Sequence, residues 1–496
     1  MIKKICVFII IGTLMMHVAY ALPVPSQDQR VKKVYDHFQE QLIWIKNDVW
    51  TPCGKTLLET ISHVDEEGLW QEKYTPIVEF LQKADLGSPE GRKRADELLT
   101  LAGLNYISDM KGGRLKPHLA VKDIHVQLTP INETEDLINY LSLPDQCGWV
   151  YALAPTAPEY QHLKALLSTY RQKQAQGGWP QLPKGTRLEK GDKGPLVETL
   201  RTQLIAQDAL SSQRQGSDIF DEALEGSVKN YQELHGLEID GKVGEATLEA
   251  LNTPVEKRIR SIIVSLERQR WFPSPLPARY IQVNIPGFYL KAVNEGLPTF
   301  FMPIITGKEY TKTPVFNAPI IEIIFNPSWH VPASIVGELL PKIQSNPGAY
   351  AAKGYHLYEG EGGVRIVQNP GQGNALGKIR FTLDDPYSIY LHGTPNEKLF
   401  KKAKRSLSHG CIRVEDPTKL AAFVFNNPDD WSIEHIKKEA SGTTTKPVKL
   451  KQPISAFITY FTVFEDENHK MHFVADEYGQ DTAIWLALEK LTIKVE

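Results

Sequence analysis

Residues 406–417 read SLSHGCIRVEDP, and this stretch decides how the C-terminal half of the chain is interpreted. Cys411 stands between a glycine and an isoleucine, with His409 two residues before it and Arg413 two residues after it. On an extended strand alternate side chains share one face, so we expect these three groups to point the same way. Nearby positive charge lowers the pKa of a thiol, and the pattern therefore favours a nucleophile over a buried core cysteine.

The residues around the cysteine also set the limits of the strand. Gly410 allows the carbonyl of a bound substrate to approach the backbone closely, and the N–H of Cys411 is then a candidate oxyanion donor. Asp416 and Pro417 are typical of a helix N-cap and first turn, so we expect the strand to end before them and a helix to follow.

A cysteine nucleophile needs a base, and two histidines are candidates. His409 is close in sequence, but a neighbour two positions away is not free to reach over the sulfur and relay a proton. His392, in YLHGTPN, ends a separate predicted strand, and 15 residues separate it from Ser408. Geometry therefore favours His392 as the base and His409 as a supporting group.

Length and composition exclude several classes of protein. A chain of 496 residues predicts roughly three domains. The net charge of −3 provides no basic excess to neutralise phosphates, so we expect no nucleic acid partner. The sequence has no cysteine and histidine cluster with zinc spacing and no phosphate-binding glycine loop, so we expect no metal and no cofactor.

The N-terminus is typical of an exported protein. Lys3 and Lys4 precede the apolar run ICVFIIIGTLMM and the tripeptide Ala-Tyr-Ala at 19–21, the pattern of a secretory signal peptide over residues 1–21. The apolar run is shorter than the ~20 residues of a membrane helix. We expect no membrane span in the mature chain, with an uncleaved anchor as the alternative.

Three cysteines lie beyond the signal, and an odd number in an oxidising compartment leaves one thiol unpaired. A disulfide between Cys53 and Cys147 is one option that spacing alone does not establish. Cys411, in a distant segment, is the natural candidate for the free thiol.

Hydrophobic periodicity divides the mature chain into parts and predicts a multidomain α+β fold. We expect a helical N-terminal scaffold at 22–178, a small three-helix unit at 184–253 and a mostly β catalytic domain at 278–480. A mixed insertion at 327–375 interrupts the β domain as a cap. Residues 443–451 (TTTKPVKLK) are expected to form a linker, and residues 481–496 a C-terminal surface tail.

The three-helix unit closely resembles the peptidoglycan-binding domain of bacterial wall enzymes. Its matching positions, mostly core and turn residues, are Gly191, Val197, Leu200, Phe220, Val228, Gln232, His235-Gly236-Leu237, Asp240-Gly241, Val243-Gly244, Thr247-Leu248 and Leu251-Asn252. The pattern indicates the fold. Whether the unit binds glycan or only positions the catalytic domain stays open.

His392 followed by Ser408-His409-Gly410-Cys411 and Arg413 resembles the signature of the L,D-transpeptidase catalytic domain. Further blocks are similar to the large periplasmic Gram-negative branch of that family, namely LERQRWFP (266–273), VNIPGFYL (283–290), TPVF (313–316), NPSWHVPASI (326–335) and GQGNALG (371–377). That branch combines a scaffold, a peptidoglycan-binding domain and a capped catalytic domain.

The resemblance implies a mechanism. Cys411 would attack the bond between residues 3 and 4 of a donor tetrapeptide stem, expel D-alanine and form a thioester. The side-chain amine of diaminopimelate on an acceptor stem would then resolve the thioester into a 3→3 cross-link. His392 would be the base, oriented by the carbonyl of Gly393. The same resemblance implies slow acylation of the cysteine by carbapenems.

The remaining site residues carry supporting roles. Ser408, His409 and Gly410 would shape the oxyanion and leaving-group region. Arg413 would hold the site or a substrate carboxylate, the alternative being an ion pair with Glu415 or Asp416. In the insertion, Trp329 and Tyr355 are predicted to line the donor groove. For each of them the alternative is a role in the core.

The signature does not distinguish between reactions that proceed through the same thioester. An L,D-carboxypeptidase, a D-amino-acid exchange enzyme and a protein that attaches a lipoprotein to the wall would use the same nucleophile and base. A non-catalytic wall-binding protein would be indicated by a changed cysteine or base histidine, and both residues are present.

Overall fold

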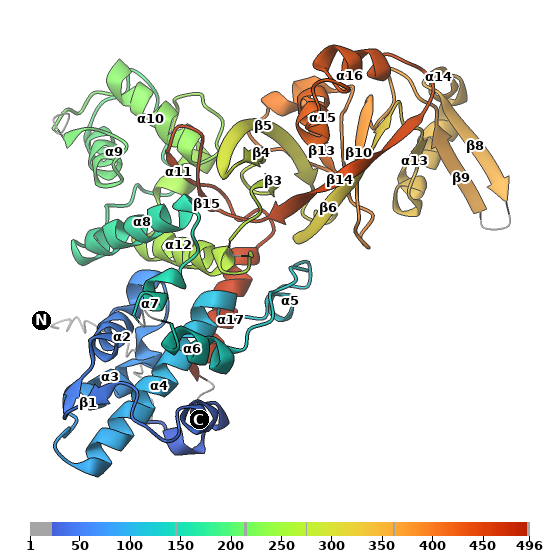
Figure 1. Ribbon diagram of the computed structural model, residues 1–496. Helices are drawn as coiled ribbons and strands as arrows, with labels where there is room; N and C mark the ends of the chain where they lie inside the picture. Colours follow the sequence, from blue (N-terminus) through green and yellow to red (C-terminus); the bar gives the residue numbers. More distant parts are fainter. Residues whose placement is uncertain (1–21, 144–146, 213–215, 274, 361–362, 494–496) are drawn as a thin grey trace, which may run out of the picture.

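The computed structural model describes residues 22–143, 147–212, 216–273, 275–360 and 363–493 (Figure 1). The expected signal peptide, residues 1–21, lies outside the described residues. Figure 1 shows a helical body at the N-terminal end, a smaller helical unit beside it, and a sheet that extends away from both. Within the described ranges, no helix is both long enough and apolar enough to span a membrane.

The N-terminal part is helical, as the periodicity predicts. Its α-helices are α1 (Gln29–His37), α2 (Pro52–Ser62), α3 (Thr75–Gln82), α4 (Pro89–Gly112), α5 (Pro117–Ala120), α6 (Glu133–Leu141), α7 (Trp149–Ala152) and α8 (Pro158–Ala175). Short elements fill the connections: η1 (Pro25–Gln27), η2 (Val64–Glu67), η3 (Gln71–Lys73), β1 (Ile45–Lys46) and β2 (Val49–Trp50). Leu98, Leu99, Ala102 and Ile107 of α4 are fully buried, so α4 forms the centre of this core.

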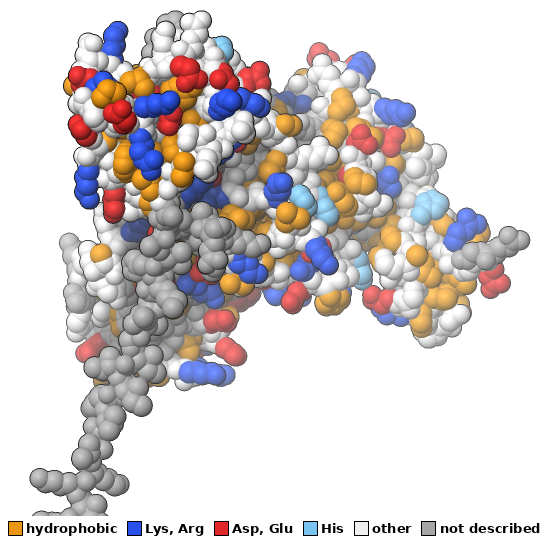
Figure 2. Space-filling view, turned by 90° about the horizontal axis from the view of Figure 1, so that it is seen from below, with side chains coloured by type: hydrophobic (Ala, Val, Ile, Leu, Met, Phe, Trp, Pro, Cys, Tyr) orange, Lys and Arg blue, Asp and Glu red, His pale blue; other side chains and the backbone are white. Residues whose placement is uncertain are grey.

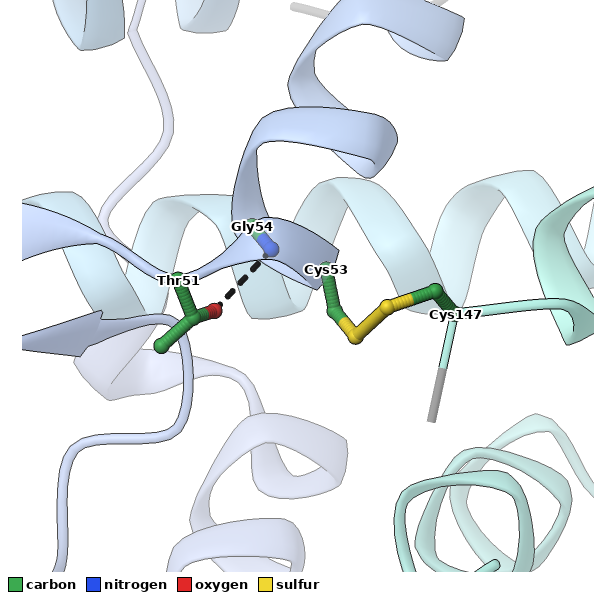
Figure 3. The surroundings of a disulfide bond; sticks show 4 residues. All are labelled: Thr51, Cys53, Gly54 and Cys147. Atoms are coloured by element: carbon green, nitrogen blue, oxygen red, sulfur yellow. Dashed lines mark hydrogen bonds between the residues drawn. A yellow bond between two sulfur atoms is a disulfide. The ribbon is translucent and has the colours of Figure 1, made fainter. Parts of the chain in front are cut away.

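A disulfide closes the scaffold. Cys53, in the first turn of α2, is bonded to Cys147, just before α7, with the Cα atoms 4.8 Å apart (Figure 3). The adjacent Thr51 caps α2, because its side-chain oxygen accepts a hydrogen bond from the N–H of Gly54 at 3.1 Å. Of the described cysteines, this leaves Cys411 as a free thiol.

The second unit contains α9 (Pro195–Ala206), α10 (Glu222–Leu234) and α11 (Glu245–Leu251). Apolar side chains from all three helices meet in one core, which contains Val197, Leu200, Leu204, Leu224, Val228, Tyr231, Leu248 and Leu251. The three-helix fold expected from the sequence is confirmed. Its contact with the rest of the molecule includes the ring of His235, stacked 6.3 Å from Phe473.

Helix α12 (Val255–Gln269) connects the helical units to the sheet. It packs along α8, and its residues contribute to the cores of both the scaffold and the catalytic domain. Near its end, the buried Arg268 pairs with Asp481, which also accepts a hydrogen bond from Thr462. A buried pair of this kind fixes the segment that carries Asp481 against α12.

The catalytic region is built on a nine-stranded sheet of the described residues, in the order β12-β5-β13-β11-β10-β6-β14-β3-β4. Its strands are β3 (Arg279–Asn284), β4 (Tyr289–Asn294), β5 (Leu297–Gly307), β6 (Phe316–Phe325), β10 (Ile379–Leu383), β11 (Tyr390–His392), β12 (Ser406–Ser408), β13 (Ile412–Val414) and β14 (Lys446–Thr459). Because β5 pairs with β4 as well as with β13, the sheet closes on itself. α15 (Pro417–Phe425) and α16 (Ile433–Ala440) follow β13, and Asp416 caps α15 as predicted.

The insertion forms a separate small layer at the far end of the sheet (Figure 1). Strands β7 (Trp329–His330), β9 (Gly363–Gln368) and β8 (Tyr355–Gly360) pair in that order, and α13 (Ala333–Ser345) and α14 (Pro347–Ala352) accompany them. This is the mixed cap that the sequence predicts between the two halves of the sheet.

Two expectations about the C-terminal region are wrong. Residues 446–451, expected in a linker, begin the long strand β14 and pair with β6. Val448 and Leu450 alternate with exposed lysines and pack half-buried against the core, a period-2 pattern that is too short to stand out in the sequence. The expected tail at 481–496 instead contains α17 (Gln480–Ile493), whose Ile484 and Leu488 are buried in the catalytic core.

Residues 460–479 connect β14 to α17 and pack against the helical N-terminal part. They contain the short hairpin β15 (Val463–Glu465) and β16 (Met471–Phe473). Val463 and Phe473 of this hairpin are buried in the scaffold core. The surface seen in Figure 2 mixes acidic and basic side chains without a large area of one sign, in keeping with the small net charge.

Candidate active site

Cys411 lies in a bend between β12 and β13, and the strand itself begins at Ile412. Gly410 has a φ of +117°, a backbone conformation that glycine adopts without strain. The expectation that His409, Cys411 and Arg413 share one strand face is therefore wrong for His409. Its exposed imidazole instead lies 3.0 Å from a carboxylate oxygen of Glu338, on helix α13 of the cap.

The thiol of Cys411 is surrounded by residues 388–390. Sγ lies 3.9 Å from the carbonyl oxygen of Ser388. Desolvation by the surrounding protein raises the pKa of Cys411, and the neighbouring Tyr390 only partly opposes that rise. The expectation of a lowered thiol pKa is thus wrong, since desolvation outweighs the effect of nearby positive charge.

His392 is buried at the end of β11, and its ring orientation is fixed. Nδ1 lies 2.6 Å from the carbonyl oxygen of Gly393, so Nδ1 carries the hydrogen and Nε2 is left as an acceptor. Burial, followed by the charge of Arg413, lowers the pKa of His392 to about 3. The imidazole is therefore neutral at physiological pH and able to accept a proton.

The backbone around His392 depends on a close contact between two glycines. Gly377, the last residue of GQGNALG, has a φ of +65°, and a Cβ built on it would lie 2.6 Å from the carbonyl carbon of Gly393. A larger residue at 377 would push away the carbonyl that orients His392. This contact explains a sequence block that carries no chemistry of its own.

Strand register places two arginines beside the histidine. His392 is the Cα partner of Arg413 on β13 and of Arg380 on β10. Partners in adjacent strands direct their side chains to the same face, so a row of three basic residues crosses the sheet. Tyr390, two residues before His392 on β11, shares that face, and the two rings lie 5.6 Å apart.

Ser408 and the loop after β5 hold the cysteine bend in place. The hydroxyl of Ser408 accepts the N–H of Gly410 at 3.1 Å and donates to the carbonyl of Cys411 at 2.6 Å. The buried Thr313 donates to the carbonyl of Gly410 at 2.6 Å, and Thr311 donates to that of Ser408 at 3.0 Å. The bend is therefore fixed on both sides of the glycine.

The C-terminal region reinforces this loop. Tyr478 donates its hydroxyl hydrogen to the carbonyl of Gly307 at 2.5 Å and accepts the N–H of Thr313 at 3.3 Å. Because Thr313 in turn holds Gly410, a chain of hydrogen bonds runs from Tyr478 to the cysteine bend. The sequence contained no motif at 478, and only the tertiary contact reveals this link.

The cap also reaches the site. Trp329 of β7 lies near enough to Tyr390 to affect the pKa of its hydroxyl, and the ring of Tyr355 lies 6.4 Å from that of Trp329 in an edge-on arrangement. Burial, followed by the neighbouring Cys411, raises the pKa of Tyr390 well above its usual range, so its hydroxyl stays protonated and can donate. Sequence reasoning missed Tyr390, although its position two residues before His392 placed both on one strand face.

Arg413 is partly buried and has no carboxylate partner. Among the ion pairs of the described residues, none joins Arg413 to Glu415 or Asp416, the alternative considered for it. Its Nε is buried without a hydrogen-bond partner. The guanidinium is therefore available to an anion that the chain itself does not supply.

Three family models match this chain. Residues 278–432 match the L,D-transpeptidase catalytic domain, residues 29–167 match a scaffold domain, and residues 193–251 match the "Putative peptidoglycan binding domain". The chain thus contains a catalytic domain of the L,D-transpeptidase family, as the signature residues predict.

Individual proteins that are similar to this chain are named L,D-transpeptidases. A "Putative L,D-transpeptidase" of Haemophilus influenzae is 30% identical over 227 residues, which cover 42% of this chain and 45% of the relative. The chain therefore spans less than half the length of that relative. Among solved structures, an L,D-transpeptidase of Xylanimonas cellulosilytica has 16% identity and a TM-score of 0.19, covering 56% of this chain and 98% of the other. One from Mycobacterium smegmatis has 13% identity and a TM-score of 0.21, covering 37% and 58%.

Proposed function

We propose that this protein is a peptidoglycan L,D-transpeptidase that forms 3→3 cross-links through a thioester on Cys411. The observation that carries the proposal is the arrangement of a free thiol in the bend before β13 with a neutral imidazole of fixed tautomer and a protonated phenol on the neighbouring strand β11. These are the nucleophile, base and oxyanion donor that acyl transfer requires. The donor is a tetrapeptide stem, and the leaving group is its terminal D-alanine.

Acylation begins with proton transfer from the thiol to Nε2 of His392. Sγ donates toward the carbonyl of Ser388, and we expect the thiol to rotate toward the imidazole as the substrate binds. Sulfur attacks the donor carbonyl, and the negative charge on its oxygen is stabilised by the N–H of Cys411 and the hydroxyl of Tyr390. His392 then returns the proton to the departing amine, and D-alanine leaves as the thioester forms.

The second half of the reaction uses the same residues in reverse. The side-chain amine of diaminopimelate on an acceptor stem loses a proton to His392 and attacks the thioester carbonyl. Collapse of the tetrahedral intermediate breaks the carbon–sulfur bond, forms the new amide and returns the proton to the cysteine. Ser408 and Gly410 hold the bend through both steps, and Gly393 keeps the base oriented.

The cap and the helical units are proposed to handle the polymer. Trp329 and Tyr355 are proposed to line the donor side of the site, and the support for this is that their rings are neighbours and that Trp329 lies near Tyr390. Residues 184–253 would hold or position the wall, and residues 1–21 would direct export to the periplasm. Arg413 is proposed to bind a carboxylate of the stem peptide.

The test incubates the protein with purified disaccharide-tetrapeptide and follows the products by mass spectrometry. The expected products are free D-alanine and a cross-linked dimer joined between two diaminopimelate residues. Tripeptide without dimer would contradict cross-linking and indicate a carboxypeptidase, and turnover by Cys411→Ala would contradict the thioester. A mass increase on Cys411 after incubation with a carbapenem, absent from Cys411→Ala, is a second expected result.

A further inference from the structure

Arg380 is a second cation beside the reacting thiol, and the signature residues do not include it. It lies on β10 directly across from His392, on the side opposite to Arg413. Its guanidinium carbon lies 5.1 Å from the centre of the Tyr390 ring, and one nitrogen donates to the hydroxyl of Thr382 at 3.3 Å. The guanidinium therefore extends along β10 toward the Tyr390 side of the cysteine.

Neither arginine is neutralised by the protein. Among the ion pairs of the described residues, none includes Arg380 or Arg413, and the Nε atoms of both are buried without a hydrogen-bond partner. The nearby Asp385 accepts the backbone N–H groups of Tyr387 and Ile389 instead. A partly buried guanidinium without an ionic partner is costly, and a bound carboxylate would satisfy it with paired hydrogen bonds.

The position of the two cations limits which carboxylate they can bind. Arg413 lies on β13, which follows the nucleophile, and Arg380 lies on β10, next to the strand that carries the base. We expect an anion bound by them to lie close to the attacked carbonyl. In a stem that ends one residue after the scissile bond, the terminal carboxylate is about 4 Å from that carbonyl. The side-chain carboxylate of diaminopimelate lies several bonds further away.

We infer that Arg380, together with Arg413, binds the terminal carboxylate of the leaving residue and so selects donor stems that end directly after the scissile bond. The inference rests on the proposed function and adds a specificity residue to it. In a stem extended by one more residue, a neutral peptide amide replaces the terminal carboxylate. The amide oxygen can still accept a hydrogen bond from the guanidinium groups, but it carries no negative charge. Such a donor would be bound less well.

The first experiment needs no peptidoglycan. The full-length protein is alkylated with iodoacetate and with iodoacetamide at one pH and ionic strength, and peptide mapping gives the rate at Cys411 for each reagent. The two reagents differ in charge and little in size. In Arg380→Gln we expect the ratio of the iodoacetate rate to the iodoacetamide rate to fall about tenfold, because the anionic reagent loses a charge-assisted contact.

Two control variants separate charge from structure. Arg380→Lys keeps the charge and should restore most of the ratio, and Lys451→Gln, which removes a cation from an exposed position of β14, should leave it unchanged. An equal loss with both reagents would overturn the inference, since Arg380 would then only support Tyr390. An unchanged ratio in Arg380→Gln would overturn it as well.

A measurement on the unmodified protein covers the case in which Arg380→Gln does not fold. D-Alanine should protect Cys411 against iodoacetamide, and D-alaninamide should protect it much less. Equal protection by the two compounds, or none by either, would contradict a carboxylate site.

The link to donor choice is tested with a tetrapeptide donor and its C-terminal amide. Arg380→Gln should raise KM for the acid severalfold, change KM for the amide little and reduce the preference between them. If neither donor acylates Cys411, the proposed function fails, while the alkylation ratio still reports on the anion site. If both donors acylate the cysteine with equal KM in the unmodified protein, the specificity role is wrong and the proposed function stands.

Discussion

His392 on β11 and Arg413 on β13 are register partners in the parallel pair that joins these two strands. The pairing brings the base of one segment beside the residues that follow the nucleophile in another. It also places a fixed positive charge next to the imidazole, which adds to burial in lowering the histidine pKa. The resting site therefore contains a neutral histidine and an uncharged thiol rather than an ion pair.

The pH dependence of Cys411 alkylation follows from this. Because desolvation raises the thiol pKa above its usual 9.0, only the rise of pH through that region produces the reactive thiolate. The rate with iodoacetamide should increase steadily from about pH 6 to about pH 9 without a plateau. A stopped-flow or mass-spectrometric pH profile checks this, and a flat rate between about pH 5 and 8 would indicate a thiolate–imidazolium pair instead.

The two histidines should differ in importance. His392→Asn removes the proton acceptor and should reduce the rate of Cys411 acylation by at least about 100-fold, within the range of general base catalysis. His409→Ala removes a side chain that contacts the cap and should reduce it only a few-fold. Acylation is measured by intact mass at short times. A larger loss in His409→Ala would reverse the assignment of the base.

Tyr390→Phe should separate acylation from simple alkylation. Loss of an oxyanion donor costs about 100-fold or more in acyl transfer, whereas alkylation by iodoacetamide forms no oxyanion. We expect the first rate to fall steeply and the second by less than about tenfold. The matched control is Tyr387→Phe, in the same segment but more exposed. Equal losses in both reactions would show that Tyr390 acts only through the thiol.

Thr313→Val tests the hydrogen bonds that hold the cysteine bend. The change leaves the buried carbonyl of Gly410 and the N–H of Gly307 without their partner, each at a cost of about 1–3 kcal/mol. We expect a lower melting temperature and an acylation rate reduced about tenfold or more. Thr311→Val is the control, because Ser408 keeps its second donor, the N–H of Lys308. Similar effects from both changes would argue against a specific role for Thr313.

The disulfide should stabilise the scaffold without affecting the chemistry. Cys53 and Cys147 are 94 residues apart in sequence, and removing a link that closes such a loop costs about 2–5 kcal/mol. Replacing both by serine should lower the denaturant midpoint of the helical part. Alkylation of Cys411 at low temperature should keep its rate, since the site belongs to a separate core. A changed alkylation rate would show that the scaffold controls the site.

Much of the site could be predicted because it is local in sequence. Cys411, His392 and Gly393 needed only the spacing of one signature, and the three-helix unit followed from apolar stripes that recur at helical period. The helix after Asp416 followed from its cap. In each case the residues that identify the feature lie within one helix or strand, or in a motif whose spacing is typical of one fold.

Other features depend on contacts that no local pattern encodes. β14 begins with lysines because that half of the strand is exposed, and α17 is held by a few buried side chains and the pair between Arg268 and Asp481. His409 turns to Glu338 because Gly410 bends the chain before the strand begins. Burial around Cys411 reverses the expected direction of its pKa shift, since desolvation depends on everything packed nearby.

The sequence by itself thus determined which residue is the candidate nucleophile, which histidine is its candidate base and which kinds of domain surround them. Only the tertiary structure brought Tyr390 and Arg380 beside His392 and linked Tyr478 to the cysteine bend. These residues come together through strand register and through hydrogen bonds between distant segments. The physical reason is that side-chain alternation fixes a face within one strand, whereas packing of the whole sheet fixes which strands are neighbours.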